Sequence, residues 1–272
     1  MTFQEKYGAW ALIAGASEGT GASFARQLAA KGLNLLLIAR REGPLAELAR
    51  DIRAKHDVEC VTGLVDLSAD DAAERMAEVA GDREVGLFIS NAGADSNGSM
   101  FLDNDLANWD ALAKRNVMTL MRSCHVFGRP MRARGRGGMI LVGSGACYGG
   151  IPGIGVYGAT KAFDLVLGEA LWAELKPHNI DVLNLIMGKT DTPAHRELMQ
   201  KLSVPFPDDC ASADDVAAVG LDRLPHGPVL NWGLEDADVG YAGTSAAARR
   251  SRIEAIAAMS ASLRKKIEDQ PS

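Results

Sequence analysis

Three side chains that could move a proton lie within one short stretch of this sequence. Ser144 follows an apolar run, 139–143, while Tyr157 and Lys161 stand four residues apart a little further on. In a helix, side chains four residues apart share one face, so the Tyr157 phenol and the Lys161 ammonium would stand side by side. A neighbouring cation favours the phenolate, which would make Tyr157 a proton donor and acceptor near neutral pH. If 139–143 is a buried strand, Ser144 at its end could hydrogen-bond the oxygen that gains or loses the proton.

The composition favours a single enzyme-sized domain. The chain has 272 residues, of which 47% are hydrophobic, and its formal net charge of -6 gives no electrostatic case for binding nucleic acid. The four cysteines are widely spaced, without a Cys-x-x-Cys pair or histidines at metal-ligand spacing, so we expect reduced thiols and no metal site. We also find no signal-peptide pattern and no apolar run near the ~20 residues of a membrane span, so we expect a cytoplasmic protein that binds no membrane.

A glycine-rich turn joins the first predicted strand to the first long predicted helix. Residues 10–14 form an apolar run, the sequence Gly-Ala-Ser-Glu-Gly-Thr-Gly follows at 15–21, and residues 22–31 have helical apolar spacing. Glycines allow a tight turn and a close approach of the backbone to a pyrophosphate at the helix N-terminus, where free N–H groups favour anions. The pattern therefore predicts a dinucleotide site, against the alternative of a plain structural turn.

The second predicted strand, 33–39, ends in two arginines, Arg40 and Arg41. In a dinucleotide fold this strand end meets the adenine ribose, where an acidic residue suits a 2′-hydroxyl and a cationic residue suits a 2′-phosphate. The sequence therefore favours NADP over NAD, and Ser17 in the first turn could add a phosphate contact. The alternative is that both arginines are ordinary solvated residues.

Short apolar runs continue to alternate with helical segments, which predicts an α/β fold with a parallel sheet and helices on both faces. The remaining predicted strands are 59–65, 85–90, 139–143, 181–186 and 228–230. The remaining predicted helices are 44–56, 70–80 with Ser68 as its N-cap, 103–128, the segment after Tyr157, 212–224 with Ser212 as its N-cap, and 246–267. We interpret about 189–211 as a lid over the substrate and about 231–272 as a C-terminal extension of one domain, 1–272.

These motifs, taken as a set, resemble the short-chain dehydrogenase/reductase family over roughly residues 8–230. Ser144, Tyr157 and Lys161 are similar to the family's catalytic residues, and 91–93 reads Asn-Ala-Gly, like its turn after the fourth strand. The turn at 15–21 resembles the family's glycine fingerprint, with Ala14 in place of a threonine. The resemblance implies a doubly wound Rossmann fold with a seven-stranded parallel sheet.

The resemblance also implies a role for each catalytic residue. Tyr157 would exchange a proton with the substrate oxygen, Ser144 would orient that oxygen, and Lys161 would assist Tyr157 and bind the nicotinamide ribose. Asn116 matches the family's asparagine whose backbone carbonyl holds a relay water. The alternative for Asn116 is a helix residue whose amide faces solvent.

The implied cofactor contacts follow the strand ends. The family usually has a proline before the glycine that Gly188 matches, and Met187 departs from that pattern. The expected cofactor-binding residues are Gly15, Ser17, Glu18, Gly19, Thr20, Gly21, Arg40, Arg41, Asp66, Leu67, Asn91, Ala92, Gly93, Tyr157, Lys161, Gly188, Thr190 and Thr192.

The resemblance implies an NADP(H)-dependent oxidoreductase that interconverts a secondary alcohol and a ketone. The segment 5–10, the Ala39-Arg40-Arg41 turn and Met187 resemble the corresponding residues of a branch that includes 7β-hydroxysteroid dehydrogenases. Membership of that branch would suit a bulky, apolar substrate. By analogy we also expect a homodimer or homotetramer. Two alternatives stay open: an NADPH-binding sensor or scaffold without turnover, and an epimerase or dehydratase of the family's usually longer, extended branch.

Overall fold

The computed structural model describes residues 2–231 apart from 96, 97, 149, 202 and 204, together with 250, 251 and 254. Within that part of the chain, seven parallel strands form one sheet in the order β3-β2-β1-β4-β5-β6-β9. The strands of this sheet are β1 (Trp10–Ala14), β2 (Asn34–Ala39), β3 (Cys60–Leu64), β4 (Val85–Ser90), β5 (Gly137–Ser144), β6 (Ile180–Met187) and β9 (Val229–Asn231). A separate two-stranded sheet pairs β7 (Thr190–Asp191) with β8 (Ala211–Ser212).

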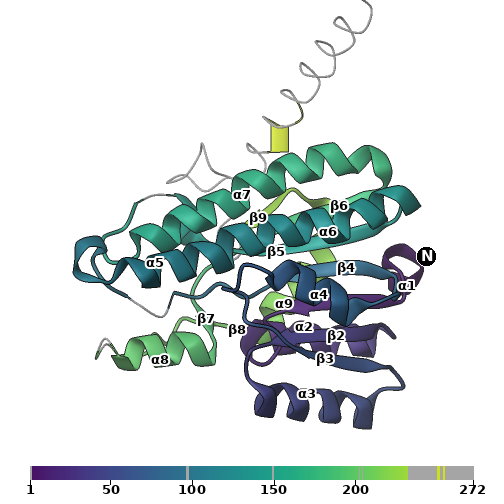
Figure 1. Cartoon of the computed structure of the whole chain (residues 1–272), viewed down its shortest axis with the longest axis horizontal. Coiled ribbons are helices and arrows are strands. Elements are labelled where there is room, and N and C mark those ends of the chain that lie inside the picture. Colours follow the sequence, from purple (N-terminus) through teal and green to yellow (C-terminus); the bar gives the residue numbers. More distant parts are fainter. Residues whose placement is uncertain are drawn as a thin grey trace, which may run out of the picture.

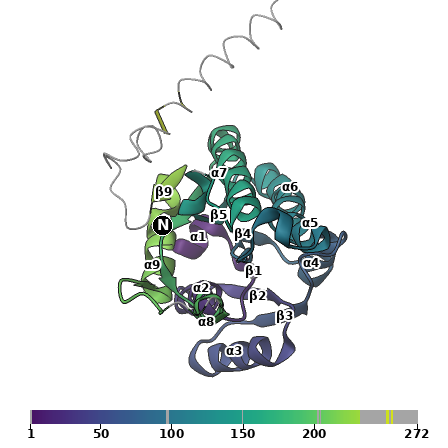
Figure 2. The ribbon, with the colours of Figure 1, turned by 90° about the vertical axis from the view of Figure 1, so that its left-hand side faces the viewer.

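Helices cover both faces of the large sheet, which confirms the predicted doubly wound Rossmann fold (Figures 1 and 2). The α-helices are α1 (Phe3–Tyr7), α2 (Gly19–Ala30), α3 (Glu42–Lys55), α4 (Ala72–Ala80), α5 (Leu106–Ala113), α6 (Thr119–Arg134), α7 (Gly155–Leu175), α8 (Pro193–Lys201) and α9 (Ala213–Arg223). Short 3₁₀ turns lie at Phe101–Asp103, Gly145–Tyr148, Lys176–His178 and Leu224–His226. Helices α2, α3 and α9 bury their apolar sides on one face of the sheet, and α4, α6 and α7 on the other.

The central strands are buried on both faces, which explains their almost wholly apolar sequences. Every residue of β1 and β4 is buried, and Leu12 and Ile13 are fully inaccessible to solvent. Their side chains divide between the two apolar layers, since Ile13 packs with α2, α3 and α9 while Leu12 packs on the opposite side. The strand ends therefore form a rigid edge on which functional side chains can be held.

One predicted helix cap is confirmed and another is wrong. Ser212 caps α9, because its hydroxyl accepts a hydrogen bond of 3.0 Å from the Asp215 amide. Ser68 does not cap α4, which begins at Ala72 with Asp71 before it. The amide and hydroxyl of Ser68 instead donate to the Asp66 carboxylate, at 2.9 and 2.7 Å, so Ser68 belongs to a turn around Asp66.

The predicted helix 103–128 forms as three consecutive segments. Helices α5 and α6 are joined by a π-helical turn, η2 (Lys114–Met118), and α6 continues to Arg134. Asn116 is buried in the middle of η2. A π turn inserts one extra residue into the helix and is often found at functional sites, so η2 gives a local reason for a helical asparagine.

Segment 189–211 follows β6 and contains β7, α8 and the first residue of β8. Arg196 of α8 makes a two-pronged ion pair with Asp191 of β7, with both N–O distances 2.6 Å. The predicted helix over 246–267 and the predicted extension over about 231–272 lie outside the described residues, apart from 231, 250, 251 and 254. In the part of the chain that the structure describes, no helix combines the length and apolar character needed to cross a membrane.

Candidate active site

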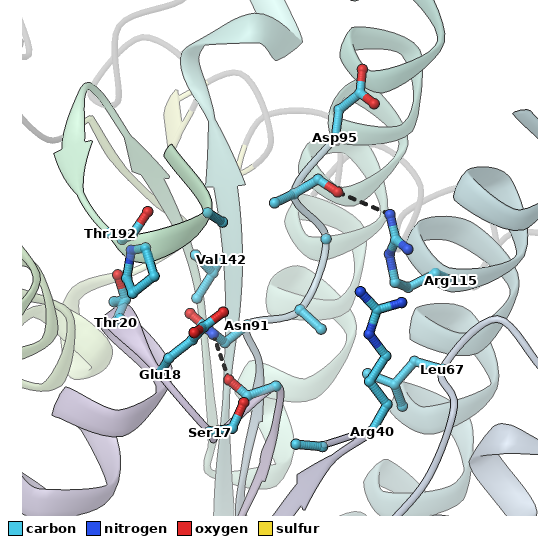
Figure 3. A pocket seen from close by; sticks show the side chains of 18 of the residues that line it. Ser17, Glu18, Thr20, Arg40, Leu67, Asn91, Asp95, Arg115, Val142 and Thr192 are labelled. Carbon is cyan, nitrogen blue, oxygen red and sulfur yellow. Dashed lines mark hydrogen bonds between the residues drawn. The ribbon is translucent and has the colours of Figure 1, made fainter. Parts of the chain in front are cut away.

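A cleft of about 500 Å³ opens along the carboxyl ends of the central strands. This is the edge where a parallel doubly wound sheet holds its ligands. Fifteen of the eighteen expected cofactor-binding residues line it: Gly15, Ser17, Glu18, Gly19, Thr20, Arg40, Arg41, Asp66, Leu67, Asn91, Ala92, Gly93, Tyr157, Lys161 and Thr192. Gly21, Gly188 and Thr190 do not line the cleft wall, and neither do Ser144 and Asn116. The cleft therefore gathers residues that lie far apart in the sequence (Figure 3).

The glycine turn at 15–21 packs too closely for side chains. Gly15 has φ +88°, and a Cβ there would lie 2.7 Å from the Ala92 amide nitrogen. A Cβ on Gly21 would collide with the Gly15 carbonyl oxygen, which also accepts a 2.9 Å hydrogen bond from the Asn91 side chain. No described side chain caps the first turn of α2, so its N–H groups remain available to an anion. The turn fits a dinucleotide pyrophosphate.

Three arginines line the same cleft. Arg41 is ion-paired with Glu18 at 2.5 Å, whereas the Arg40 guanidinium points toward Arg115, whose own guanidinium turns to the Ala94 carbonyl (Figure 3). Arg115 donates to the Ala94 carbonyl oxygen at 2.9 Å. Burial lowers the pKa of Arg115 and the neighbouring Arg40 lowers it further, while Asp95 and Asp66 oppose that shift. Two neighbouring cations in one cleft form a site suited to an anion.

Lys161 lies beside Tyr157, as the four-residue spacing predicts. The Lys161 Nζ is 5.9 Å from the Tyr157 ring centroid and donates to the Val142 carbonyl and to the Asp164 carboxylate, both at 2.9 Å. The lysine is 4% exposed. Burial by itself lowers the pKa of Lys161, but the attraction of Asp164 and Tyr157 outweighs burial and raises it. Lys161 is therefore a buried ammonium in the cleft wall.

Asn116 connects the loop after β4 to α7 through its side chain. Its Nδ2 donates to the Gly93 carbonyl at 3.1 Å and to the Thr160 hydroxyl at 2.9 Å. The Thr160 hydroxyl in turn donates to the Tyr157 carbonyl at 2.8 Å, so the asparagine braces the helical turn that carries Tyr157. The amide is 2% exposed, which rules out the alternative that it faces solvent.

Ser144 is the last residue of β5 and is half-buried. Its hydroxyl oxygen accepts a 3.3 Å hydrogen bond from the Ala146 amide. Two residues of the same strand, Val142 and Gly143, line the cleft directly. The predicted strand end is thus confirmed, while the contact of Ser144 with a substrate oxygen stays a prediction.

Sequence reasoning missed Arg115, Thr160 and Asp164. Each adjoins or lies within one helical turn of a predicted site residue, namely Asn116, Tyr157 or Lys161, so helix periodicity was the signal that could have identified Thr160 and Asp164. Among the residues that the structure describes, no group of three or more histidine, cysteine or acidic side chains is placed to hold a metal ion.

The fold, the cleft and the Tyr157–Lys161 pair define an enzyme class that the family comparison names. A family model described as short chain dehydrogenase matches residues 9–203, and the chain belongs to that family. It is therefore an oxidoreductase of a family that uses nicotinamide cofactors.

Individual proteins and solved structures give a more detailed comparison than the family model. The chain is 32% identical over 194 residues to a 7β-hydroxysteroid dehydrogenase of Mediterraneibacter gnavus, covering 71% of this chain and 73% of that protein. A solved structure from a study of 7β-hydroxysteroid dehydrogenase stereoselectivity superposes with a TM-score of 0.80 at 28% identity, covering 93% of this chain and 100% of that one. A short-chain dehydrogenase from Sphingobium yanoikuyae in complex with NADPH superposes with a TM-score of 0.75 at 25% identity, covering 97% and 96%. These matches bear out the predicted resemblance to the 7β-hydroxysteroid dehydrogenase branch.

Proposed function

We propose that this chain is an NADP(H)-dependent oxidoreductase that interconverts a secondary alcohol and a ketone. The observation that carries the proposal is the buried Lys161 ammonium beside Tyr157, in the wall of the same cleft as the glycine turn. A nicotinamide cofactor, when bound there, supplies or accepts the hydride.

The side chains of the chain itself would handle the proton. In ketone reduction the Tyr157 hydroxyl donates its proton to the carbonyl oxygen, and in alcohol oxidation the phenolate accepts it back. The Lys161 ammonium stabilises the phenolate and has an N–H for a ribose hydroxyl. Ser144 would orient the reacting oxygen, and the backbone of Asn116 would hold a relay water. The direction of the net reaction depends on the supply of cofactor and substrate.

The preference for NADP over NAD rests on Arg40, and Arg115 adds to it. Because Arg41 is already paired with Glu18, Arg40 is the better candidate of the two strand-end arginines for a 2′-phosphate. Arg115 lies next to Arg40 in the cleft and would share the charge of that phosphate (Figure 3). The NADPH complex of the Sphingobium yanoikuyae relative supports the same choice.

A bulky, apolar substrate such as a hydroxysteroid is the substrate class that we propose. The 7β-hydroxysteroid dehydrogenase relatives support it, as does the semi-exposed segment after β5, where Cys147 and Tyr148 pack against an apolar cluster. The Tyr148 hydroxyl is hydrogen-bonded to Asn231 of β9, which ties this segment to the sheet. Segment 189–211, which includes α8, would cover the substrate.

A homodimer or homotetramer would form through the helices that lie side by side on one face, α5, α6 and α7 (Figure 1). Large apolar side chains are exposed on these helices and on the π turn between α5 and α6, among them Leu106, Met118, Met121 and Val166. Pairing would remove this apolar surface from water.

The test is NADP-dependent turnover of a panel of hydroxysteroids and simpler secondary alcohols, with NAD measured in parallel. The proposal predicts turnover of at least one panel member with NADP, and weaker activity with NAD. If NADPH binds tightly but no alcohol or ketone reacts, the sensor alternative is favoured. If no nicotinamide cofactor binds, the proposal is wrong.

A further inference from the structure

Asp164 is a buried carboxylate that the proposed chemistry does not yet use. It is 1% exposed, and its Oδ2 is 2.9 Å from the Lys161 Nζ. Its other oxygen, Oδ1, is buried without a hydrogen-bond partner among the described residues. An incompletely satisfied buried carboxylate costs free energy, and apolar residues often replace a buried ion pair without loss of stability. A stabilising role therefore does not explain why the charge stands next to Lys161.

We propose that Asp164 is a positioning residue that holds the Lys161 ammonium in place and offsets part of its charge, thereby setting the pH range in which Tyr157 exchanges its proton. This inference rests on the proposed roles of Tyr157 and Lys161.

The positioning part follows from the hydrogen bonds of the ammonium. An ammonium has three N–H donors, and two of them are directed to the Val142 carbonyl and to Asp164. The two acceptors come from different elements, β5 and α7, so together they fix the end of a flexible four-carbon side chain. The third N–H donor remains for a ribose hydroxyl or for the Tyr157 oxygen.

The electrostatic part follows from the short distances. The Lys161 Nζ lies 2.9 Å from the carboxylate and 5.9 Å from the Tyr157 ring centroid, so the carboxylate and the ring are no farther apart than about 9 Å. A negative charge this close to the ring, in a site shielded from water, acts on the proton equilibrium of the phenol. The sign is definite: the carboxylate disfavours a phenolate at Tyr157, so removing the negative charge moves phenolate formation to lower pH.

Two further groups face this pair from neighbouring helices. Arg115 of η2 acts on Lys161 as a like charge and stays cationic at neutral pH. Cys124 of α6 faces Asp164, and burial together with Asp164 raises the pKa of its thiol to about 12. Neither group changes its charge near neutral pH. Removing the charge of the Asp164 carboxylate should therefore have a visible effect on the proton exchange of Tyr157.

The experiment is an ultraviolet absorbance titration of Tyr157 in the cofactor-free enzyme. The chain has four tyrosines, so subtracting the spectrum of Tyr157→Phe isolates the phenolate of Tyr157. In Asp164→Asn, which keeps the shape of the side chain and an acceptor oxygen, we expect the titration midpoint to fall. The acid limb of the pH–rate profile for alcohol oxidation should move to lower pH as well.

Glu169 provides the matched control, because it is a buried carboxylate on α7 about two turns beyond Lys161. Glu169→Gln should leave the midpoint where it is in the parent enzyme. The proposal is overturned if Asp164→Asn leaves the midpoint unchanged, or if Glu169→Gln moves it as far. Asp164→Ser replaces Asp164→Asn if the latter does not fold, with the same expected direction. Since the titration needs no substrate, an enzyme inactive on every alcohol would contradict the proposed function without deciding this test.

Discussion

A methyl group on Gly21 would collide with the carbonyl oxygen of Gly15 and would lie 2.7 Å from the Asn91 side-chain nitrogen. The first turn of α2 can pack this closely against the turn after β1 because residue 21 has no side chain. In Gly21→Ala the turn must open, at a cost of about 1–3 kcal/mol, so we expect NADPH affinity to fall by at least about tenfold. Fluorescence titration with NADPH would measure the loss.

Gly43→Ala is the control for this prediction. Gly43 lies in α3 and does not have a positive φ, and apart from its chain neighbours and the backbone of its own helix, no described atom lies within 4 Å of the place where an alanine methyl group would lie. Alanine should therefore stabilise α3 by about 0.5–1 kcal/mol and leave NADPH affinity unchanged. Equal affinity losses in both variants would contradict the steric explanation.

Thr160 should matter for stability through Asn116. Thr160→Val keeps the volume but removes the acceptor for the Asn116 amide and the donor to the Tyr157 carbonyl. A buried donor without a partner costs about 1–3 kcal/mol, so the free energy of unfolding should fall by that amount in urea denaturation. Thr160→Ser, which keeps the hydroxyl, should lose less. If Thr160→Val is as stable as Thr160→Ser, the hydroxyl has no bracing role.

Arg40 and Arg115 should make the enzyme bind NADPH more tightly than NADH. Removing either guanidinium should weaken NADPH binding by about tenfold or more, because a charge-assisted hydrogen bond contributes about 1.5–3 kcal/mol. NADH lacks the 2′-phosphate, so its affinity should change little. Dissociation constants of Arg40→Ala and Arg115→Ala for both cofactors would test this. An equal loss of affinity for NADPH and NADH in both variants would show that neither arginine contacts the 2′-phosphate.

Cys124 should make the fold sensitive to alkaline pH. Burial raises the pKa of its thiol to about 12, above the ordinary value of 9.0, with Asp164 adding to the shift. The folded state therefore retains a proton that the unfolded state loses above pH 9, so this stability contribution is complete below that pH and is lost as pH rises toward 12. Between pH 8 and pH 10, the parent should lose about 1 kcal/mol more unfolding free energy than Cys124→Ala. Identical pH dependence in urea denaturation would contradict the assignment.

The sequence was sufficient to predict the fold because each structural signal was local. The strands at 10–14 and 85–90 have the predicted bounds, since runs of apolar residues buried on both faces leave few alternatives. The pairing of Tyr157 with Lys161 was also predictable, because helical spacing alone brings i and i+4 together.

The remaining features depend on contacts between distant segments. Arg115 lies near Arg40 only because the fold brings the π turn and the end of β2 to the same cleft, which no local pattern records. The Ser68 prediction failed because the Asp66 carboxylate competed for its amide and hydroxyl. Asp164 has helical spacing to Lys161, but its burial depends on how α7 packs against the sheet.

The most direct test of the central claim compares the parent enzyme with Tyr157→Phe. NADPH affinity and NADP-dependent turnover of the best alcohol substrate would be measured on both proteins. If Tyr157 transfers the proton, the variant binds NADPH about as tightly as the parent and its turnover falls by a factor of about 10²–10⁴. Turnover close to that of the parent, with NADPH still bound, would contradict the assigned role of Tyr157 and with it the proposed chemistry.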